Sequence, residues 1–244
     1  DRFYPEWDYW DQFLDDAMNT AMSLDALKTS HPIDVKVNHP SEIREIFDSI
    51  SYDKGGCILR MLEHFVGEKN FQKGLQKYLM KHQYDNAQGS DLWNAIGQVS
   101  KQPIDKMMKT WINQVGFPLL EVKRNTSTLT LKQSRFLLED DKNPSKKTWS
   151  IPLVIEEGNQ RMKKLMTKKS EKIHLKNKDR NFIINSGRTG FYRIQYDKET
   201  LENLSLLIEE KVLDHVDRWS LQNDYFAQAV SGKKNIQEYL DFTS

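Results

Sequence analysis

The side chain in this sequence with the clearest capacity for chemistry is the phenol of Tyr52, which lies in the stretch from Ile46 to Gly56. A phenol with a pKa of about 10 stays protonated at neutral pH, so it acts as a hydrogen-bond donor. Such a donor, aimed at a developing oxyanion, lowers a reaction barrier by roughly 3–4 kcal/mol. A tyrosine at the start of a helix is more often a half-buried packing residue with a wet hydroxyl. Spacing alone therefore favours a packing role for Tyr52.

The histidine and cysteine pattern predicts no metal site within this chain. The sequence has no His-Glu-x-x-His motif and no pair of histidines at i, i+4 spacing. Its single cysteine, Cys57, excludes a Cys-rich zinc site. Because Cys57 lies on the apolar side of a predicted helix, we expect it to be an inert packing residue. The six histidines are scattered, at His31, His39, His64, His82, His174 and His215.

Motifs for nucleophilic catalysis and phosphate binding are also absent from the sequence. There is no Gly-x-Ser-x-Gly elbow, and Gly55-Gly56 lacks the preceding strand that a phosphate loop needs. These two glycines fall in the first turn of a helix predicted to run from near Tyr52 to Gly67. Each costs about 1 kcal/mol there relative to alanine, so we expect the backbone of another element to approach them closely.

Charge is unevenly distributed along the chain, whose formal net charge is +1. Residues 1–53 carry twelve acidic and four basic side chains, whereas residues 161–180 carry nine basic and two acidic ones. The acidic excess is interpreted as solvated helix faces, and the alternative is a field that attracts the cationic N-terminus of peptides. The basic block lacks the interleaved aromatic residues that stack on bases, so we predict a solvated sheet face and no nucleic-acid binding.

Composition predicts a soluble protein with well-formed cores. Of the 244 residues, 29% are charged and 11% are aromatic, and the aromatic residues supply large apolar area. No apolar run approaches the roughly 18 residues of a membrane span, and residues 1–4 do not begin a signal peptide. A single cysteine forms no internal disulfide, which favours the cytoplasm. The chain lacks an initiator methionine and ends just after an apolar-periodic stretch, so we predict a portion of a longer protein.

Apolar periodicity divides the chain into three regions. From residue 1 to about residue 115, apolar side chains recur at a period close to 3.6, which predicts helices. After Gly116-Phe117-Pro118 the period changes to 2, and six or seven short strands separated by turn signals predict a small antiparallel β-sandwich. From Lys198 onward the helical period returns. Tyr52 is therefore expected at a helix start within the first region.

Ten motifs, spread in order along nearly the whole chain, carry a family resemblance. They are Phe3–Trp7, Ser30–Ile33, Ser41–Gly55, Ile58–Leu62, Tyr84–Ala87, Asp91–Trp93, Trp111–Pro118, Gln133–Leu137, Gly190–Arg193 and Asp217–Asp224. Together they closely resemble the gluzincin zinc aminopeptidases, the family of aminopeptidase N and the tricorn-interacting factors. Because so many ordered motifs match, the resemblance is highly specific.

The resemblance implies a zinc exopeptidase that removes residues from peptide N-termini. Tyr52 matches the tyrosine of the family's Ile-Ser-Tyr-x-Lys-Gly motif, which donates to the tetrahedral oxyanion. The family's zinc ligands, general base and amine-binding segment fall upstream of residue 1. Zinc is therefore expected in the parent enzyme, whereas this chain by itself is expected to bind no catalytic zinc and to hydrolyse no peptide.

The implied fold class is a multidomain α+β protein. We expect residues 1–116 to form the helical distal half of a thermolysin-like catalytic domain, residues 117–197 an antiparallel β-sandwich, and residues 198–244 the start of a C-terminal helical domain. The predicted function is thus that of a portion of a cytoplasmic zinc aminopeptidase acting on peptides. The alternative is a non-catalytic protein-interaction module built on the same scaffold.

Overall fold

The computed structural model describes residues 3–139, 145–176 and 181–243, which run from helices to strands and back to helices. This order follows the predicted change of apolar period from 3.6 to 2 and back. The first helical region comprises the short η1 (Pro5–Trp7), α1 (Tyr9–Gln12), the π-helical η2 (Phe13–Met18), α2 (Asn19–Asp25), the 3-10 helix η3 (Pro40–Ile46), the π-helical η4 (Ile50–Lys54), α3 (Gly55–Val66), α4 (Glu68–Lys81), α5 (Gly89–Ser100) and α6 (Ile104–Ile112).

Helix α3 is the element that continues directly from the turn holding Tyr52. Its apolar face, which includes Cys57, Ile58 and Leu62, is buried. The helix ends at Gly67, as the sequence predicts, because Gly67 adopts a φ of 86° that side chains disfavour. The Gly67 N–H donates to the carbonyl of Glu63 at 2.7 Å and closes the last turn.

Two sheets follow the first helical region. Their strands are β1 (Pro118–Asn125), β2 (Thr128–Arg135), β3 (Ile151–Glu157), β4 (Gln160–Met166), β5 (Ser170–His174), β6 (Phe182–Ile184) and β7 (Arg193–Tyr196). The four-stranded sheet has the order β5-β2-β1-β7, and the three-stranded sheet has the order β4-β3-β6.

One pairing in the larger sheet corrects the expectation of purely antiparallel strands. Strand β7 pairs with β1 in parallel, with Leu119 level with Arg193. A parallel pair needs a long crossover connection rather than a hairpin. Here the intervening strands, including the whole second sheet, provide that connection and bring β7 back along β1 in the same direction.

The second helical region consists of α7 (Lys198–Glu209), α8 (His215–Val230) and α9 (Ile236–Thr243). Aspartates cap the first two helices: Asp197 accepts from the N–H of Thr200, and Asp214 accepts from the N–H of Val216. An aspartate at the N-cap satisfies a backbone donor that the helix leaves free. Both helices therefore begin at these acidic residues.

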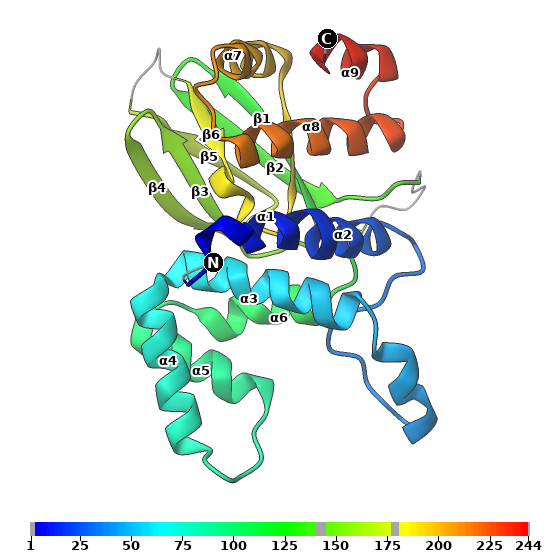
Figure 1. Cartoon of the computed structure of the whole chain (residues 1–244), viewed down its shortest axis with the longest axis vertical. Helices are drawn as coiled ribbons and strands as arrows, with labels where there is room; N and C mark the ends of the chain where they lie inside the picture. The colour runs from blue at the N-terminus through cyan, green and yellow to red at the C-terminus, as the bar shows by residue number, and fades with distance from the viewer. Residues whose placement is uncertain (1–2, 140–144, 177–180, 244) are drawn as a thin grey trace.

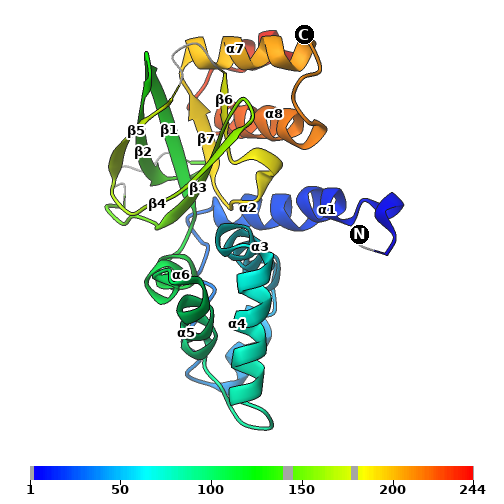
Figure 2. The same ribbon diagram turned by 90° about the vertical axis from the view of Figure 1, so that its left-hand side faces the viewer.

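The parts of the molecule are arranged around α1, η2 and α2. In both ribbon views these elements lie between α3–α6, in the lower half, and the sheets with α7–α9, in the upper half (Figures 1 and 2). Among the residues that the structure describes, one cluster of buried apolar side chains runs from the helices into both sheets. Among the described residues, no helix is both apolar enough and long enough to cross a membrane.

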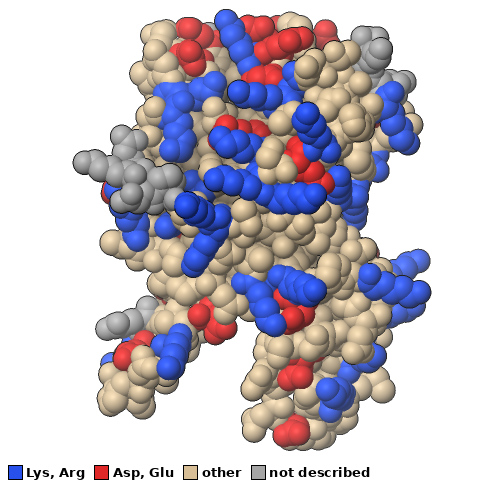
Figure 3. Space-filling view, turned by 180° about the vertical axis from the view of Figure 1, so that it is seen from behind, with Lys and Arg blue, Asp and Glu red and all other residues tan. Residues whose placement is uncertain are grey.

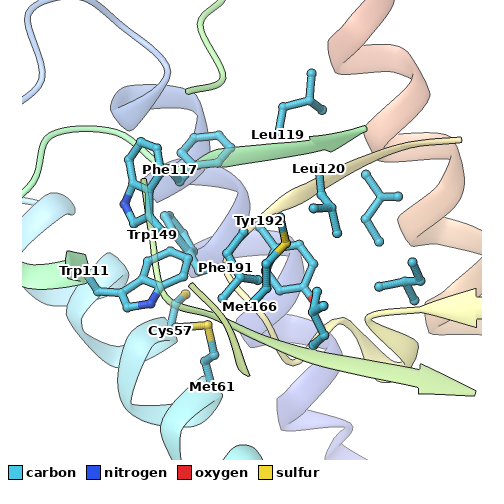
Figure 4. Packing of buried hydrophobic residues seen from close by; sticks show 14 of the residues in the cluster. Cys57, Met61, Trp111, Phe117, Leu119, Leu120, Trp149, Met166, Phe191 and Tyr192 are labelled. Carbon is cyan, nitrogen blue, oxygen red and sulfur yellow. The ribbon is translucent and has the colours of Figure 1, made fainter. Parts of the chain in front are cut away.

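Two tryptophans join α6 to the sheets within this core. Figure 4 shows Trp111 of α6 beside Trp149, with Cys57 and Met61 of α3 close by. The two indole rings are 6.4 Å apart, and the N–H of Trp111 donates to the carbonyl of Ser150 at 2.8 Å. A buried indole N–H needs such a partner. The first helical region is therefore fixed to the sheets by both packing and a hydrogen bond.

Buried charges join the sheets to α8 and α3. The Asp224 carboxylate of α8 contacts Arg188 at 3.1 Å and Arg193 at 2.9 Å, and it accepts from the N–H of Ile194. Arg60 of α3 donates to the carbonyl of Arg188 at 2.8 Å. Burial lowers the pKa of Arg193 to about 10, although Asp224 opposes the shift. We call these residues the Asp224 cluster.

Candidate functional site

Tyr52 lies in η4, a π-helical turn that leads directly into α3. Its side chain is 60% exposed, which makes it more exposed than the half-buried packing residue that spacing alone favours. Its aromatic neighbour is Phe47, which is 65% exposed, and the two ring centroids are 5.6 Å apart. π-helical turns within helices are often found at functional sites. The phenol is therefore presented on the surface of the described chain.

Asp48 holds the N-terminal end of the turn. Its Oδ1 accepts from the N–H groups of Ile50 and Ser51 at 3.0 and 2.9 Å, and its backbone carbonyl accepts from the N–H of Tyr52 at 3.0 Å. These N–H groups are ones that a helix start leaves without internal partners. The side chain and backbone of Asp48 together fix where the turn begins.

His31 in turn holds Asp48. Its Nε2 lies 2.6 Å from Oδ2 of Asp48, and its Nδ1 lies 2.8 Å from the carbonyl oxygen of Pro32. A carboxylate and a carbonyl can only accept, so both ring nitrogens donate and the imidazole is doubly protonated in this arrangement. His31 and Asp48 therefore form a charged pair.

The pKa shifts of the two residues agree with this geometry. Burial lowers the pKa of His31, but the hydrogen bonds to Asp48 and to the Pro32 carbonyl outweigh it, so the pKa is raised. Burial raises the pKa of Asp48, but the hydrogen bonds from His31 and from the N–H of Ser51 outweigh it, so the pKa is lowered. Both shifts stabilise the charged forms.

Lys54 holds the C-terminal end of the turn. Its Nζ lies 2.8 Å from Oδ2 of Asp25, at the end of α2, and both side chains are 0% exposed. The same ammonium donates to the carbonyl of Gly116 at 3.2 Å. Burial lowers the pKa of Lys54, and the charge of Asp25 opposes that shift.

The other oxygen of Asp25 completes the arrangement. Oδ1 accepts from the Ser30 hydroxyl at 2.6 Å and from the N–H of Gly116 at 2.9 Å. Both sides of residue 116 are therefore bonded to the ion pair: its N–H to Asp25 and its carbonyl to Lys54. Residue 116 is a glycine for two reasons, because its φ is +85° and because a Cβ would lie 2.4 Å from Nε of Arg135.

The two glycines after Lys54 correct an expectation from the sequence. Among the described residues of other elements, nothing lies within 4 Å of a Cβ built on Gly55, and a Cβ on Gly56 would meet only the ring of Phe13, at 3.6 Å. In this part of the chain no backbone of another element comes within 4 Å of either position. The prediction is wrong because the neighbouring element, η2, contacts this turn with an aromatic side chain rather than with its main chain.

Cys57 is an inert core residue, as the sequence predicts. The side chain is 0% exposed, and burial raises the pKa of its thiol to about 12. A thiol with so high a pKa supplies very little thiolate, which is the reactive form. Within residues 3–139, 145–176 and 181–243, no group of three or more His, Cys, Asp or Glu residues is arranged to hold a metal ion.

Most of the described basic side chains of the block are exposed, on β4, on β5 or next to these strands. Figure 3 shows Lys and Arg side chains spread over the upper body of the molecule, with Asp and Glu between them. Within the block, Arg161 lies 3.4 Å from Glu156, and Lys164 lies 2.5 Å from Glu171. These contacts agree with a solvated sheet face. Residues 177–180 of the block lie outside the described residues.

The family resemblance singled out Tyr52, but the residues that hold its turn were missed. Asp25, Ser30 and Lys54 form one group, and His31 with Asp48 forms the other. A usable signal was present for Asp25 and Lys54. Each is a charged residue next to an apolar-periodic helical segment, where an isolated charge would be costly and a partner is required.

The chain has an α+β fold and exposes a tyrosine on the turn that precedes a helix. Comparison with known proteins identifies its family. Residues 1–111 match the peptidase family M1 domain, and residues 181–244 match the ERAP1-like C-terminal domain. The chain belongs to the M1 peptidases. The predicted resemblance to the aminopeptidase N and tricorn-interacting-factor family is confirmed.

Individual relatives match almost the whole chain. It is 38% identical over 238 residues to a probable aminopeptidase 2 of Sulfurisphaera tokodaii, covering 98% of this chain and 29% of the relative. It is 38% identical over 241 residues to the tricorn protease-interacting factor F2 of Thermoplasma volcanium, covering 99% and 30%. A puromycin-sensitive aminopeptidase of Caenorhabditis elegans is 36% identical over 251 residues, covering 97% and 26%. The chain thus spans less than a third of the length of these relatives.

We expect replacement of Lys54 by methionine to lower the free energy of unfolding by about 3–5 kcal/mol, because it leaves Asp25 buried without its partner charge. Urea unfolding of the 244-residue chain measures the change. Lys109→Met is the matched control, since Lys109 forms an exposed pair with Asp105 at 2.8 Å, and such pairs contribute about 0.3–0.5 kcal/mol. A loss for Lys54→Met no larger than that of the control contradicts the assignment.

The His31–Asp48 pair predicts a pH-dependent contribution to stability. The pKa of His31 is raised, so its contribution is complete below the unfolded value of about 6.5 and is lost as the pH rises through the folded pKa. The pKa of Asp48 is lowered, so its contribution is present above about 3.9 and is lost as the pH falls through its folded pKa. The pair therefore stabilises most between these limits.

The test is the difference in unfolding free energy between the chain and His31→Gln, measured in urea from pH 4 to pH 8. We expect this difference to be largest near pH 5–6 and to decrease toward pH 8, for the reasons of linkage given above. Asp48→Asn is the companion variant and should remove the same pH-dependent part. A difference that stays constant from pH 5 to pH 8 would show that the pair is not charged in the folded chain.

Proposed function

We propose that this chain is the distal part of a zinc-dependent aminopeptidase, in which Tyr52 donates a hydrogen bond to the oxyanion formed when an N-terminal peptide bond is hydrolysed. The observation that carries the proposal is the placement of Tyr52. Its ring is 60% exposed, whereas its turn is held at one end by Asp48 and at the other by Lys54. An exposed donor on a fixed turn suits a group that must be ready before charge develops.

The ligands of the metal are expected elsewhere in the longer protein. The described residues contain no cluster of His, Cys, Asp and Glu suited to a metal ion, so they do not fit a zinc centre by themselves. The match to the M1 domain covers residues 1–111 of this chain, and relatives are more than three times as long as the chain. We therefore assign the zinc motif, the general base and the amine-binding segment to sequence upstream of Asp1.

The same proposal divides the chain into three parts. Residues 1–116 form the helical distal half of a thermolysin-like catalytic domain, residues 117–197 a β-sandwich domain, and residues 198–244 the start of a C-terminal helical domain. The matched ranges, 1–111 and 181–244, support a division of this kind. The substrates are peptides with a free N-terminus, and the compartment is the cytoplasm, which the single cysteine favours.

A non-catalytic interaction module is the second candidate function. It is favoured by the name of one relative, a tricorn protease-interacting factor. The coding sequence upstream of Asp1 separates the two candidates. A His-Glu-x-x-His motif followed by a glutamate supports the peptidase, and its absence supports the module.

We expect Tyr52→Phe in the longer enzyme to lower kcat by a factor of about 10²–10³, the usual cost of removing one oxyanion donor. The free energy of unfolding should change by less than about 0.5 kcal/mol, because substitutions at exposed positions rarely exceed that. Steady-state kinetics with an aminoacyl chromogenic substrate, together with urea unfolding, measure both. Tyr84→Phe is the control, since Tyr84 is fully exposed. A kcat that matches the control contradicts the proposed role.

The isolated chain is predicted to be inactive. Purified chain at micromolar concentration, supplied with zinc and the same chromogenic substrate, should show no turnover above buffer, because the part of it that the structure describes offers no ligand set for the metal. Isothermal titration with zinc checks metal binding directly. Turnover that a chelator abolishes would place the catalytic site within these residues and overturn the assignment of the zinc motif to upstream sequence.

A further inference from the structure

We propose that the buried pair of Asp25 and Lys54 positions Tyr52 for its role, so that Lys54 is a positioning residue of the site. This inference rests on the proposed function of Tyr52. It adds residues that do not touch the substrate but determine where the phenol is held. Three observations carry it: the place of Lys54 on the turn, the groups that hold its charge, and the exposure of the Tyr52 side chain.

Lys54 and Tyr52 share one π-helical turn. They are two residues apart in η4, and the carbonyl of Tyr52 accepts from the N–H of Gly55, directly after Lys54. The Lys54 side chain is 0% exposed, whereas the Tyr52 side chain is largely exposed. The turn thus directs one side chain into the protein and the other outward. Any rotation of the turn that moves the phenol must also move the ammonium.

The buried end of the turn is held by a network of ionic and hydrogen-bond contacts. The ammonium contacts the carboxylate of Asp25 and the carbonyl of Gly116, and the carboxylate is held in turn by the Ser30 hydroxyl and the N–H of Gly116. In a low-dielectric interior, breaking such a network leaves buried charges that no water molecule solvates. The network therefore defines one position for Lys54 and, through the backbone, one position for Tyr52.

Among the described residues, the Tyr52 side chain itself is only weakly restrained. Its ring contact there is with Phe47, which is itself 65% exposed. Contacts between exposed side chains do little to fix a backbone, because both partners remain mobile in water. The phenol is therefore positioned through its backbone, which Asp48 holds at the N-terminal end of the turn and Lys54 at the C-terminal end.

Gly116 extends the same network to the sheets. It precedes the buried Phe117 and the first residue of β1, Pro118, and both its N–H and its carbonyl are bonded to the ion pair. A displacement of β1 would consequently act on Asp25 and Lys54 together. The sheets are thereby connected, through Gly116, to the turn that carries Tyr52.

The decisive test is a double-mutant cycle in the longer enzyme. Lys54→Met should lower kcat at least tenfold, with KM within twofold and zinc content unchanged. In the Tyr52→Phe background, Lys54→Met should lower kcat less than twofold further, because residues that act through one group are not additive. An equal fold-loss in both backgrounds would show a role unrelated to Tyr52 and would overturn the inference. Lys109→Met is the control for removing a paired lysine.

A measurement that does not depend on catalysis completes the test. The 244-residue chain is labelled with 3-fluorotyrosine, and the ¹⁹F resonance of Tyr52 is identified by its loss in Tyr52→Phe. We expect Lys54→Met to shift or broaden that resonance while the resonance of the fully exposed Tyr84 stays unchanged. An unchanged Tyr52 resonance in a folded Lys54→Met chain would overturn the inference.

A milder variant keeps the inference testable if Lys54→Met does not fold. Ser30→Ala removes one hydrogen bond to Asp25 while keeping both charges. It should give a smaller change of the same kind, about twofold to tenfold in kcat. Failure of the two proposals is distinguishable: an unaffected Tyr52→Phe overturns the proposed function, whereas a slow Tyr52→Phe with fully active Lys54 and Ser30 variants overturns only this inference.

Discussion

The arrangement of this chain depends on one buried ion pair, between Asp25 and Lys54. It joins the end of α2, the turn that holds Tyr52, and the Gly116 peptide before the first strand. Two charges withdrawn from water contribute little net stability, since desolvation offsets their attraction. They do make every arrangement that separates them costly. The pair therefore acts mainly by selecting one relative placement of three segments.

The Asp224 cluster follows the same physical rule at the other end of the molecule. One carboxylate accepts from two arginines and a backbone N–H, and Arg60 connects the cluster to α3. In both places a buried acid is satisfied by cations and by main-chain donors together, as buried charges require. The buried charges lie where helices meet sheets, so polar contacts specify the junctions while apolar packing fills the space between them.

Much of the fold followed from local pattern, and the misses have identifiable causes. The change of period near Gly116 predicted the passage from helices to strands, and Gly67 was correctly expected to end α3. The parallel pairing of β1 with β7 was missed, because strand direction depends on the path of the connection rather than on alternation. The prediction of a close backbone approach at Gly55 was wrong, because a glycine in the sequence does not show which element packs against it.

The sequence by itself determined the order of the elements, the inert core role of Cys57 and the family to which the chain belongs. Periodicity and ordered motifs are local properties, so they can be recognised in the sequence without knowledge of tertiary contacts. Only the tertiary structure decided what surrounds Tyr52. The bonds that hold its turn join Lys54 to Gly116 across 62 positions and Asp25 to Gly116 across 91. These bonds form only in the folded chain, where groups that are distant in the sequence are buried together. A buried charge needs a partner, so burial makes the bonds necessary.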